Sequence, residues 1–537
     1  MRSVRTDPLL SRLVDRVMEI ARDLGRTLPE IRFFLLDGLE FAALLEKNVY
    51  PASPLNLWEG KRMAHRRHRI ETGEETTLYY EVVQTGDPAY AYLNSANSPV
   101  IQASVMAHVV GHCEFSLLNV LRDAEPDRTE RVLHLVRKVE LARQQMGQKD
   151  YVEFWNACES ATSLAAPRSQ YNLDRTVETE SHPSPGVGDG ESSPPQRPIL
   201  PVFDTLTELL HPAEEPPFER EIRVRRRQQA LGRRGYVLRA PCQDVLGFLR
   251  LYAPLSPAER RVLDYLYETR APQEFVMRTQ IMNEGWAMYW EKKIMLELFR
   301  ERMIPGVIEY ARVFSGVCAP RPYFQRNPYH VGYNLWCRIE EDLRHGRLTL
   351  EYQEETDLER REAWDHPTPV DPIEAMGRIV RTTTDAEFLR RYLTKEAVEA
   401  LSLNRIPRPL AERMGVRPAD AHRADDQWVW LDPEAVRQEM LRFYVHFYRP
   451  RIYVVDTEFR DGGLLLYHRD DGRTLRQDWI RPTLRNLNRI WKGPVALVTR
   501  SSLHAYAGGR YVQEEVEPVE FEEVRERMLR GEKALAA

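Results

Sequence analysis

The sequence predicts a mostly α-helical α+β protein, with a helical body, an N-terminal β-hairpin and a small C-terminal α/β domain. Three observations lead to this fold class. Apolar residues recur at helical spacing over most of the chain, β-branched and aromatic residues cluster around 77–93, and strand-like runs replace the helical pattern after Tyr448. A length of 537 residues, of which 42% are hydrophobic, is sufficient for several units with buried cores.

Composition excludes several classes of protein. The formal net charge of -5 provides no general attraction to nucleic acid or anionic lipid, so a nucleic-acid partner is not expected. The 5 cysteines are far apart and form no C-x-x-C pair, which excludes a disulfide framework and points to the reducing cytoplasm. The N-terminus lacks the apolar core of a signal peptide, and no stretch is apolar enough to predict a membrane span.

Helix-start and turn signals locate the first elements. Asp7 followed by Pro8 is typical of a helix N-terminus, and Gly25 is typical of its end. A second helix is predicted from Ile31 to Lys47. The segment Thr77–Thr85, followed by a Gly-Asp-Pro turn and an AYAYL run, predicts a β-hairpin because β-branched and aromatic residues favour strands.

The next helix is expected to begin at Ser98 and Pro99, to end near Leu121 and, being nearly uncharged, to be buried. From Ser181 to Pro198, Pro, Gly and Ser fill 12 of 18 positions, too little apolar surface to offset the entropy of ordering, so we predict a linker. The arginine-rich run Arg220–Arg234 is interpreted as a solvated face or a partner of the acidic segment before it, with phosphate binding as the alternative.

The order of these patterns predicts the domain organisation. Helical patterns dominate from Asp244 to Arg302 and from Asp371 to Tyr448, and a strand, strand, helix, strand, strand pattern follows. We therefore divide the chain into an N-terminal helical region with the hairpin, a disordered linker, a second helical region that packs on the first, and a C-terminal α/β domain, at 1–165, 166–200, 201–440 and 441–537.

The first candidate site is the segment HVVGHCEF, His108 to Phe115. His108 and His112 are four residues apart, so their imidazoles lie about 40° apart on one face of a helix and converge on one point. This geometry suits a zinc ion, which accepts histidine nitrogens at about 2.0–2.1 Å. Two structural core histidines are the alternative.

The second candidate site is the helix Ile281–Met295, where Glu284 is surrounded by apolar residues and must be paired, protonated or ligated. Glu291 follows seven residues later and points about 20° away, so the two carboxylates face the same place. Buried like charges repel unless a cation or a shared proton intervenes, whereas an arginine from another helix would give an ordinary ion pair.

Together the two helices provide nitrogen and oxygen ligands for a divalent transition metal, with zinc as the first choice and ferrous iron or manganese as alternatives. The predicted ligands are His108, His112, Glu284 and Glu291. Glu291 is also the candidate general base, because the position that carries the glutamate of H-E-x-x-H enzymes is Val109. His330 is a second candidate catalytic residue or a further ligand, although a single histidine is more often structural.

At these motifs the chain resembles the stage V sporulation protein R (SpoVR-like) family. HVVGHCEFSLLN and TQIMNEGWAMYWEKKIM match the two most specific blocks of that family. Five further blocks are similar, namely LWEGKRM, APQEF, NPYHVGYNLWCRIEEDL, FLRRYLTKEAVEAL and the C-terminal LLLYHRDDGRTL with TLRNLNRIWKGPV. The resemblance implies a helical cytoplasmic protein with a role in spore cortex formation and with protein partners in sporulation or cell-wall metabolism.

The chain departs from the family at two positions. Leu57 precedes Trp58 where the family commonly has histidine, and Glu291 also stands where histidine is common. The arrangement from Glu284 to Glu291 also resembles a block in zinc-peptidase-like sequences whose third metal ligand is a glutamate. Two functions therefore remain open: a metal-dependent hydrolase of peptide or cell-wall amide bonds, and a non-enzymatic regulatory or assembly protein with a structural metal or buried polar cluster.

Overall fold

A computed structural model gives the fold of the chain in two compact units, each assembled from two separate parts of the sequence. Unit 1 comprises Met1–Leu141 and Glu268–Arg449, and unit 2 comprises Ala142–Tyr267 and Pro450–Ala537. The structure describes residues 2–38, 40, 41, 44, 82–122, 128–167, 169, 238, 240–270, 272–322, 325–416, 421–446, 449–472 and 474–534. The predicted linker and the arginine-rich run lie outside these residues, and the four-part division of the chain stays a prediction.

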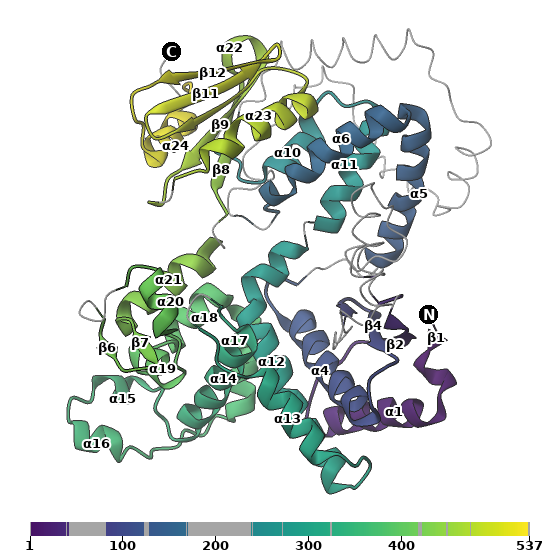
Figure 1. Ribbon diagram of the computed structural model, residues 1–537, viewed down its shortest axis with the longest axis vertical. Coiled ribbons are helices and arrows are strands. Elements are labelled where there is room, and N and C mark those ends of the chain that lie inside the picture. The colour runs from purple at the N-terminus through teal and green to yellow at the C-terminus, as the bar shows by residue number, and fades with distance from the viewer. Residues whose placement is uncertain are drawn as a thin grey trace, which may run out of the picture. The chain divides into compact units, whose positions relative to one another are not determined.

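Unit 1 is mostly helical, as predicted, and α12 is its central helix (Figure 1). Helix α4 packs along α12, α14 packs against another side of it, and α1 packs on α4. The helices of this unit are α1 (Pro8–Asp23), α4 (Pro99–Leu118), α12 (Gln273–Arg300), α13 (Val307–Val317), α14 (Pro328–Arg344), α15 (Leu350–Glu354), α16 (Leu358–Glu362), α17 (Pro372–Thr382), α18 (Asp385–Tyr392), α19 (Lys395–Ala400), α20 (Arg408–Arg413) and α21 (Pro433–His446). Helices α5 (Arg128–Met146) and α11 (Pro257–Arg270) contain residues of both units.

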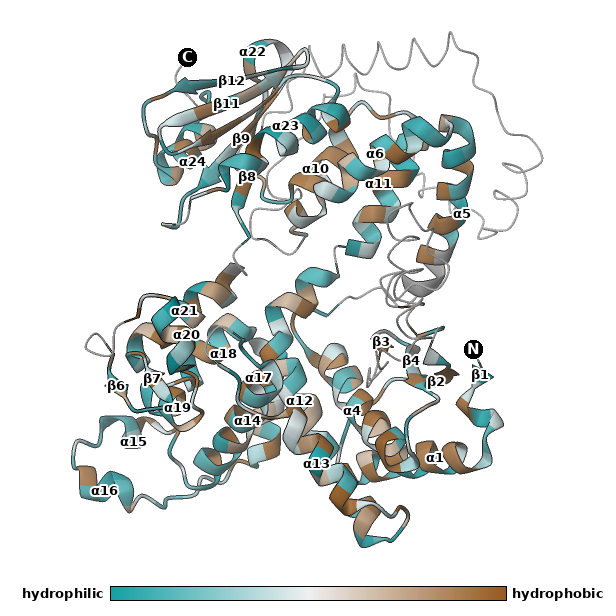
Figure 2. Ribbon diagram, viewed as in Figure 1, coloured by the Kyte–Doolittle hydropathy of each residue, from teal (hydrophilic) through white to brown (hydrophobic). Residues whose placement is uncertain are grey.

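The two predicted helix starts are confirmed. Asp7 accepts hydrogen bonds from the backbone N–H groups of Leu9 and Leu10 at the start of α1, and the Ser98 hydroxyl accepts one from Ile101 at the start of α4. Every residue of α4 from Val100 to Phe115 is buried, and hydrophobic residues occupy much of this helix in Figure 2. The predicted burial of this nearly uncharged helix is therefore confirmed.

A small sheet near the N-terminus corrects the first part of the predicted helix from Ile31 to Lys47, whereas residues 38, 40, 41 and 44, which are described, are helical as predicted. Ile31–Leu36 is instead strand β2, which pairs in parallel with β4 (Ala89–Asn94). Phe33 and Leu35 face the main core while Leu36 packs in a second cluster, so both faces of the strand are apolar. A strand apolar on both faces shows no alternation, and its short run of apolar residues was mistaken for a helix.

The remaining strands of this sheet are β1 (Arg2–Ser3) and β3 (Val82–Gln84), in the order β1-β2-β4-β3. Strands β3 and β4 are antiparallel, which confirms the hairpin for its described part, while residues 77–81 of that prediction lie outside the described residues. A second small sheet, β5 (Arg405–Pro407), β7 (Trp428–Trp430) and β6 (Arg423–Ala424), was not predicted because such short strands show no periodicity.

Unit 2 contains a five-stranded mixed sheet in the order β12-β11-β10-β9-β8. Only β9 and β10 are parallel, and α23 provides the crossover between them. The strand at Ser502–Ala507 was missed by the sequence prediction, which placed one strand rather than two after β10. The elements of this unit are α6 (Gln148–Ser160), α10 (Val245–Tyr252), β8 (Arg451–Glu458), α22 (Phe459–Gly462), β9 (Gly463–Arg469), α23 (Gln477–Trp491), β10 (Val495–Thr499), β11 (Ser502–Ala507), β12 (Arg510–Glu515) and α24 (Phe521–Leu529).

The sequence predicts neither a membrane span nor a disulfide framework. In the described ranges, none of the helices combines the length and the apolar character that a membrane span requires. All five cysteines are free thiols in the structure. The cytoplasmic location inferred from the sequence stays a prediction.

Candidate metal centre

The centre lies where α4 crosses α12, and a glycine of α4 allows the two helices to approach closely. Gly111 stands between the two histidines of α4 and faces Ala287 of α12. A Cβ atom added to Gly111 would lie 2.5 Å from the Ala287 Cα atom. Only a residue without a side chain fits this crossing, and the close approach brings the histidine face of α4 onto α12.

Glycines also allow a close helix contact on the other side of α12, where α14 packs. A Cβ atom on Gly285 would lie 2.2 Å from the carbonyl carbon of Gly332 in α14, and one on Gly332 would lie 2.0 Å from the Ile281 carbonyl oxygen. Gly285 directly follows Glu284 in the sequence. The glycines of three sequence motifs therefore hold α4, α12 and α14 together around Glu284.

His108, His112 and Glu284 form a compact, largely buried cluster at this crossing. Glu284 Oε2 lies 3.7 Å from His108 Nε2 and 3.4 Å from His112 Nε2. One ligand atom from each of the three residues lies within 4.8 Å of the others. The side chains are 5%, 7% and 18% exposed, respectively. The structure therefore brings together three of the four residues predicted as metal ligands in an arrangement that could hold an ion.

A second layer of oxygen atoms orients the two imidazoles. Glu291 Oε2 lies 2.8 Å from His108 Nδ1, and Asn283 Oδ1 lies 2.9 Å from His112 Nδ1. Because these oxygens accept hydrogen bonds, each Nδ1 carries a proton, and in the neutral form of each ring the lone pair of Nε2 is directed toward Glu284. The Ser104 hydroxyl donates a 2.6 Å hydrogen bond to Glu291 Oε1 and so fixes that carboxylate.

The electrostatics of Glu284 follow from this arrangement. Burial by itself raises the pKa of Glu284, but when no metal ion is bound His112 and His108 can take up a proton on Nε2, and their positive charge outweighs burial and lowers the pKa to about 2. Its Oε2 atom is buried and has no hydrogen-bond partner among the described residues. A carboxylate that stays ionised while one oxygen is buried without a donor is suited to a cation.

Glu291 was predicted as both a ligand and a general base, and the structure places it behind His108, on the ring nitrogen that faces away from Glu284. Its two carboxylate oxygens already accept from Ser104 and His108. Ser104 and Asn283 were missed by the sequence reasoning. Their only signal was their position in the two motifs: Ser104 lies four residues before His108, and Asn283 directly precedes Glu284.

His330 is not brought to the cluster. Its Nδ1 lies 2.9 Å from the backbone oxygen of Cys318 and its Nε2 lies 2.9 Å from that of Leu401, so both ring nitrogens contact the main chain. This histidine joins α14 to two other segments of unit 1.

Glu114, two residues after His112, has a structural role of the same kind. Its carboxylate is 2% exposed and accepts hydrogen bonds from the Arg26 guanidinium, the Thr27 backbone and the Trp286 indole. The Arg26 guanidinium also lies 3.7 Å from the centre of the Trp290 ring. This pair ties the end of α1 to α4 and α12.

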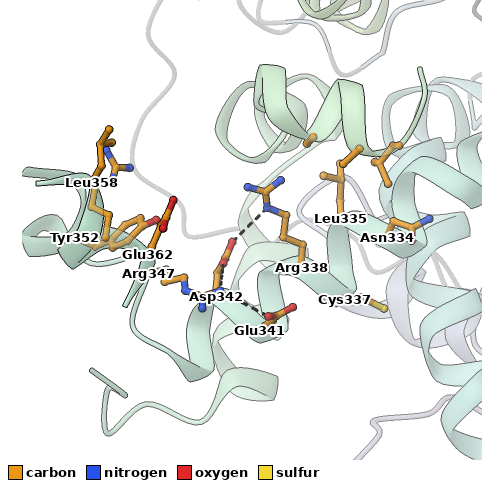
Figure 3. Close-up of a pocket in the computed structure, with 14 residues that line it drawn as sticks. Asn334, Leu335, Cys337, Arg338, Glu341, Asp342, Arg347, Tyr352, Leu358 and Glu362 are labelled. Carbon is orange, nitrogen blue, oxygen red and sulfur yellow. Dashed lines mark ion pairs between the residues drawn. The ribbon is translucent and has the colours of Figure 1, made fainter. Parts of the chain in front are cut away.

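Unit 1 also contains a cavity of about 590 Å³ whose lining differs from the histidine cluster, because charged side chains form much of it. It lies among α14, α15, α16 and α19, and Figure 3 shows Arg338 and Arg347 directed toward Asp342. Nitrogen–oxygen distances to Asp342 are 3.7 Å from Arg338 and 3.6 Å from Arg347. The charges around Asp342 are thus paired with each other, and the cavity does not offer the converging histidine nitrogens of the α4–α12 crossing.

Comparison with known proteins relates these motifs to a family. The sequence profile of the family described as "SpoVR like protein" matches residues 7–445. A curated relative, "Uncharacterized protein YcgB" of Escherichia coli (strain K12), is 24% identical over 300 residues. That alignment covers 52% of this chain and 53% of the relative, so the chain spans about half the length of the relative. No solved structure matches the chain.

Proposed function

This chain belongs to the SpoVR-like family, and we propose that it is a metal-dependent hydrolase that cleaves amide bonds in peptides or cell-wall precursors. In the proposal, His108, His112 and Glu284 hold the metal ion, with zinc as the first choice. The spore-cortex role implied by the family resemblance is part of the same proposal, since cortex formation requires cell-wall chemistry. The name of the E. coli relative assigns no activity and adds nothing to the choice.

One observation carries the proposal: the Nε2 atoms of His108 and His112 and the Oε2 atom of Glu284 face each other at the largely buried crossing of α4 and α12. Without a metal ion, or a proton on one of the rings, these three electron-rich atoms repel one another. Tetrahedral zinc with bonds of about 2.0–2.1 Å requires ligand atoms roughly 3.3–3.4 Å apart, close to the 3.4 and 3.7 Å found here.

A fourth position distinguishes a catalytic from a structural site. Structural zinc sites are closed by four protein ligands, whereas catalytic sites have three and leave one position open. Among the described residues, the cluster contains three ligand residues, which favours the catalytic type. A divalent ion held there would supply Lewis-acid polarisation of a carbonyl oxygen.

The residues of the second layer act through the ligands. Glu291 holds His108 by its Nδ1 atom, and Asn283 does the same for His112, so both rings keep the orientation that directs Nε2 toward Glu284. We propose that Glu291 is a positioning residue. Its expected roles as ligand and base are the alternative, and the hydrogen bonds that its two oxygens accept from Ser104 and His108 favour the positioning role.

The test is metal analysis of protein purified without chelator, followed by an assay for new amino groups released from peptides and peptidoglycan fragments. We expect about one divalent transition-metal ion per chain and hydrolysis that a chelator abolishes. Glu284→Gln, which is nearly isosteric, should lose the metal and the activity. Glu291→Gln should keep the three ligands but bind the metal about tenfold to a hundredfold more weakly.

His345→Ala is the matched control, because His345 also pairs with a carboxylate, at 2.8 Å from Asp365, but lies at an exposed position. It should change neither metal content nor activity. Metal at background level in the wild-type protein would refute the metal centre. Bound metal without any hydrolysis would instead support the non-enzymatic role.

A further inference from the structure

A small cavity adjoins the metal centre, and His108 belongs to both. It measures about 160 Å³ and lies among α4, α12, α13 and the start of α14. Ser104, His108 and Glu291 line one part of it. The ring of Tyr329, which also lines the cavity, is centred 6.0 Å from the His108 ring. A molecule in this cavity would therefore touch the residues that orient the proposed metal ligands.

The rest of the wall is apolar. It consists of Val105 and Met288, which are buried, and of three side chains of α13 that are partly exposed, Val313, Phe314 and Val317. An apolar cavity of about 150 Å³ in a protein binds a molecule of the size of benzene. The space therefore suits one branched aliphatic or aromatic side chain of a ligand.

Arg321 provides the only cationic group among the side chains that line the described cavity. It is exposed, and no ion pair joins it to a carboxylate of the described residues. The acidic group of the wall, Glu291, is already engaged by Ser104 and His108. An arginine guanidinium offers paired N–H donors that match the two oxygens of a carboxylate.

We infer that this cavity binds the C-terminal residue of a peptide substrate, with an apolar side chain inside the cavity and the terminal carboxylate on Arg321. The inference rests on the proposed function and deepens it, because it names the substrate class of the same site. It also makes Arg321 a specificity-determining residue. Burial of the apolar side chain provides affinity, and the charge pair selects a free terminus over an internal residue.

The test measures binding to the full-length protein by isothermal titration calorimetry, independently of activity. The probes are acetyl-leucine, its amide, and acetyl-alanyl-alanyl-leucine. We expect both acids to bind and the amide to bind about tenfold to a hundredfold more weakly, the range for a hydrogen-bonded charged group. In Arg321→Gln the acids should fall to the affinity of the amide, while the amide is unchanged.

Two further variants keep the result interpretable. Arg312→Gln removes another exposed arginine, in α13, that does not line the cavity, and it should leave all affinities unchanged. Val313→Phe adds a ring to the cavity wall and should abolish binding of all three probes. Equal melting temperatures of wild type, Arg321→Gln and Arg312→Gln would show that the fold is intact.

The inference is overturned if acid and amide bind equally, if Arg321→Gln keeps the wild-type affinity, or if no probe binds to the wild type. Binding of acetyl-leucine but not of the tripeptide would overturn the peptide assignment in favour of a small carboxylic acid. Failure of the proposed function is distinguishable: a protein that selects the acids in this way but contains no metal would refute the metal centre and leave this cavity as a carboxylate site.

Discussion

Gly111 is the position at which a single methyl group should separate the two halves of the metal centre. In Gly111→Ala the new Cβ atom would lie 2.5 Å from the Ala287 Cα atom, about 0.9 Å short of the 3.4 Å at which ordinary contact begins. The obstacle is a backbone atom of α12, which cannot rotate away as a side chain would. The helices must therefore move apart, and the histidines on either side of Gly111 must move with α4.

The size of the effect follows from two opposing terms. Overpacking in a well-packed core costs about 1–3 kcal/mol, and an unyielding backbone contact favours the upper end. Replacing glycine by alanine within a helix returns about 1 kcal/mol. We expect a net loss of about 2 kcal/mol and, because unit 1 has more than 250 residues, a melting temperature lower by roughly 2–4 °C. The widened gap between the histidines and Glu284 should also weaken metal binding by roughly tenfold or more.

Gly316→Ala is the matched control. Gly316 also lies in a helix of unit 1, but a Cβ atom there would meet nothing within 4 Å. This variant should gain up to about 1 kcal/mol from helix propensity and keep the wild-type metal affinity. The assays are a thermal melt and a competition titration with a metal-binding dye. If Gly111→Ala matched Gly316→Ala in both, the close crossing of α4 and α12 would not hold the centre together.

Two further predictions concern buried charges. The pKa of Glu284 in the folded protein, about 2, lies below its ordinary value of 4.5, so this carboxylate contributes stability that is fully present above about pH 4.5 and is lost as the pH falls toward 2. Urea unfolding of metal-free protein at several pH values should show this loss, and Glu284→Gln should flatten the profile; an unchanged profile would contradict the assigned shift. Glu114→Ala removes the partner of a buried arginine and should cost about 3–5 kcal/mol, because Arg26 keeps its charge in a site that is 9% exposed. A loss below about 1 kcal/mol in urea unfolding would show that Arg26 moves into solvent instead.

The sequence by itself determined the features that depend on neighbours along the chain. The caps at Asp7 and Ser98, the burial of α4, and the hairpin of β3 and β4 all follow from local spacing and residue type. The same local rule placed His108 and His112 on one face, because residues four apart on a helix are always neighbours. It also brought attention to Glu284, since a carboxylate in an apolar helix must find a partner.

Only the tertiary structure decided which atoms of these residues meet. Glu284 and Glu291 lie on one face of α12, yet the crossing with α4 turns the first toward the Nε2 atoms of both histidines and the second toward Nδ1 of His108. One is therefore a candidate ligand and the other a candidate positioning residue. Periodicity reports the face on which a side chain lies, but a helix pair sets the depth and angle of contact.

The prediction of a helix at Ile31–Leu36 was wrong for a related reason. Its apolar residues are buried on both faces of a sheet whose parallel partner, Ala89–Asn94, lies more than fifty residues away in the sequence. Local spacing contains no information on such a partner, so a helix and a doubly buried strand give the same short apolar pattern.

The glycines at the helix crossings were visible in the sequence motifs, but the sequence did not show what they contact. The tertiary structure shows that Gly111 packs on Ala287 and that Gly285 packs on Gly332. Close packing between distant segments is a property of the folded chain, and it is this packing that converts three separate motifs into one candidate metal centre.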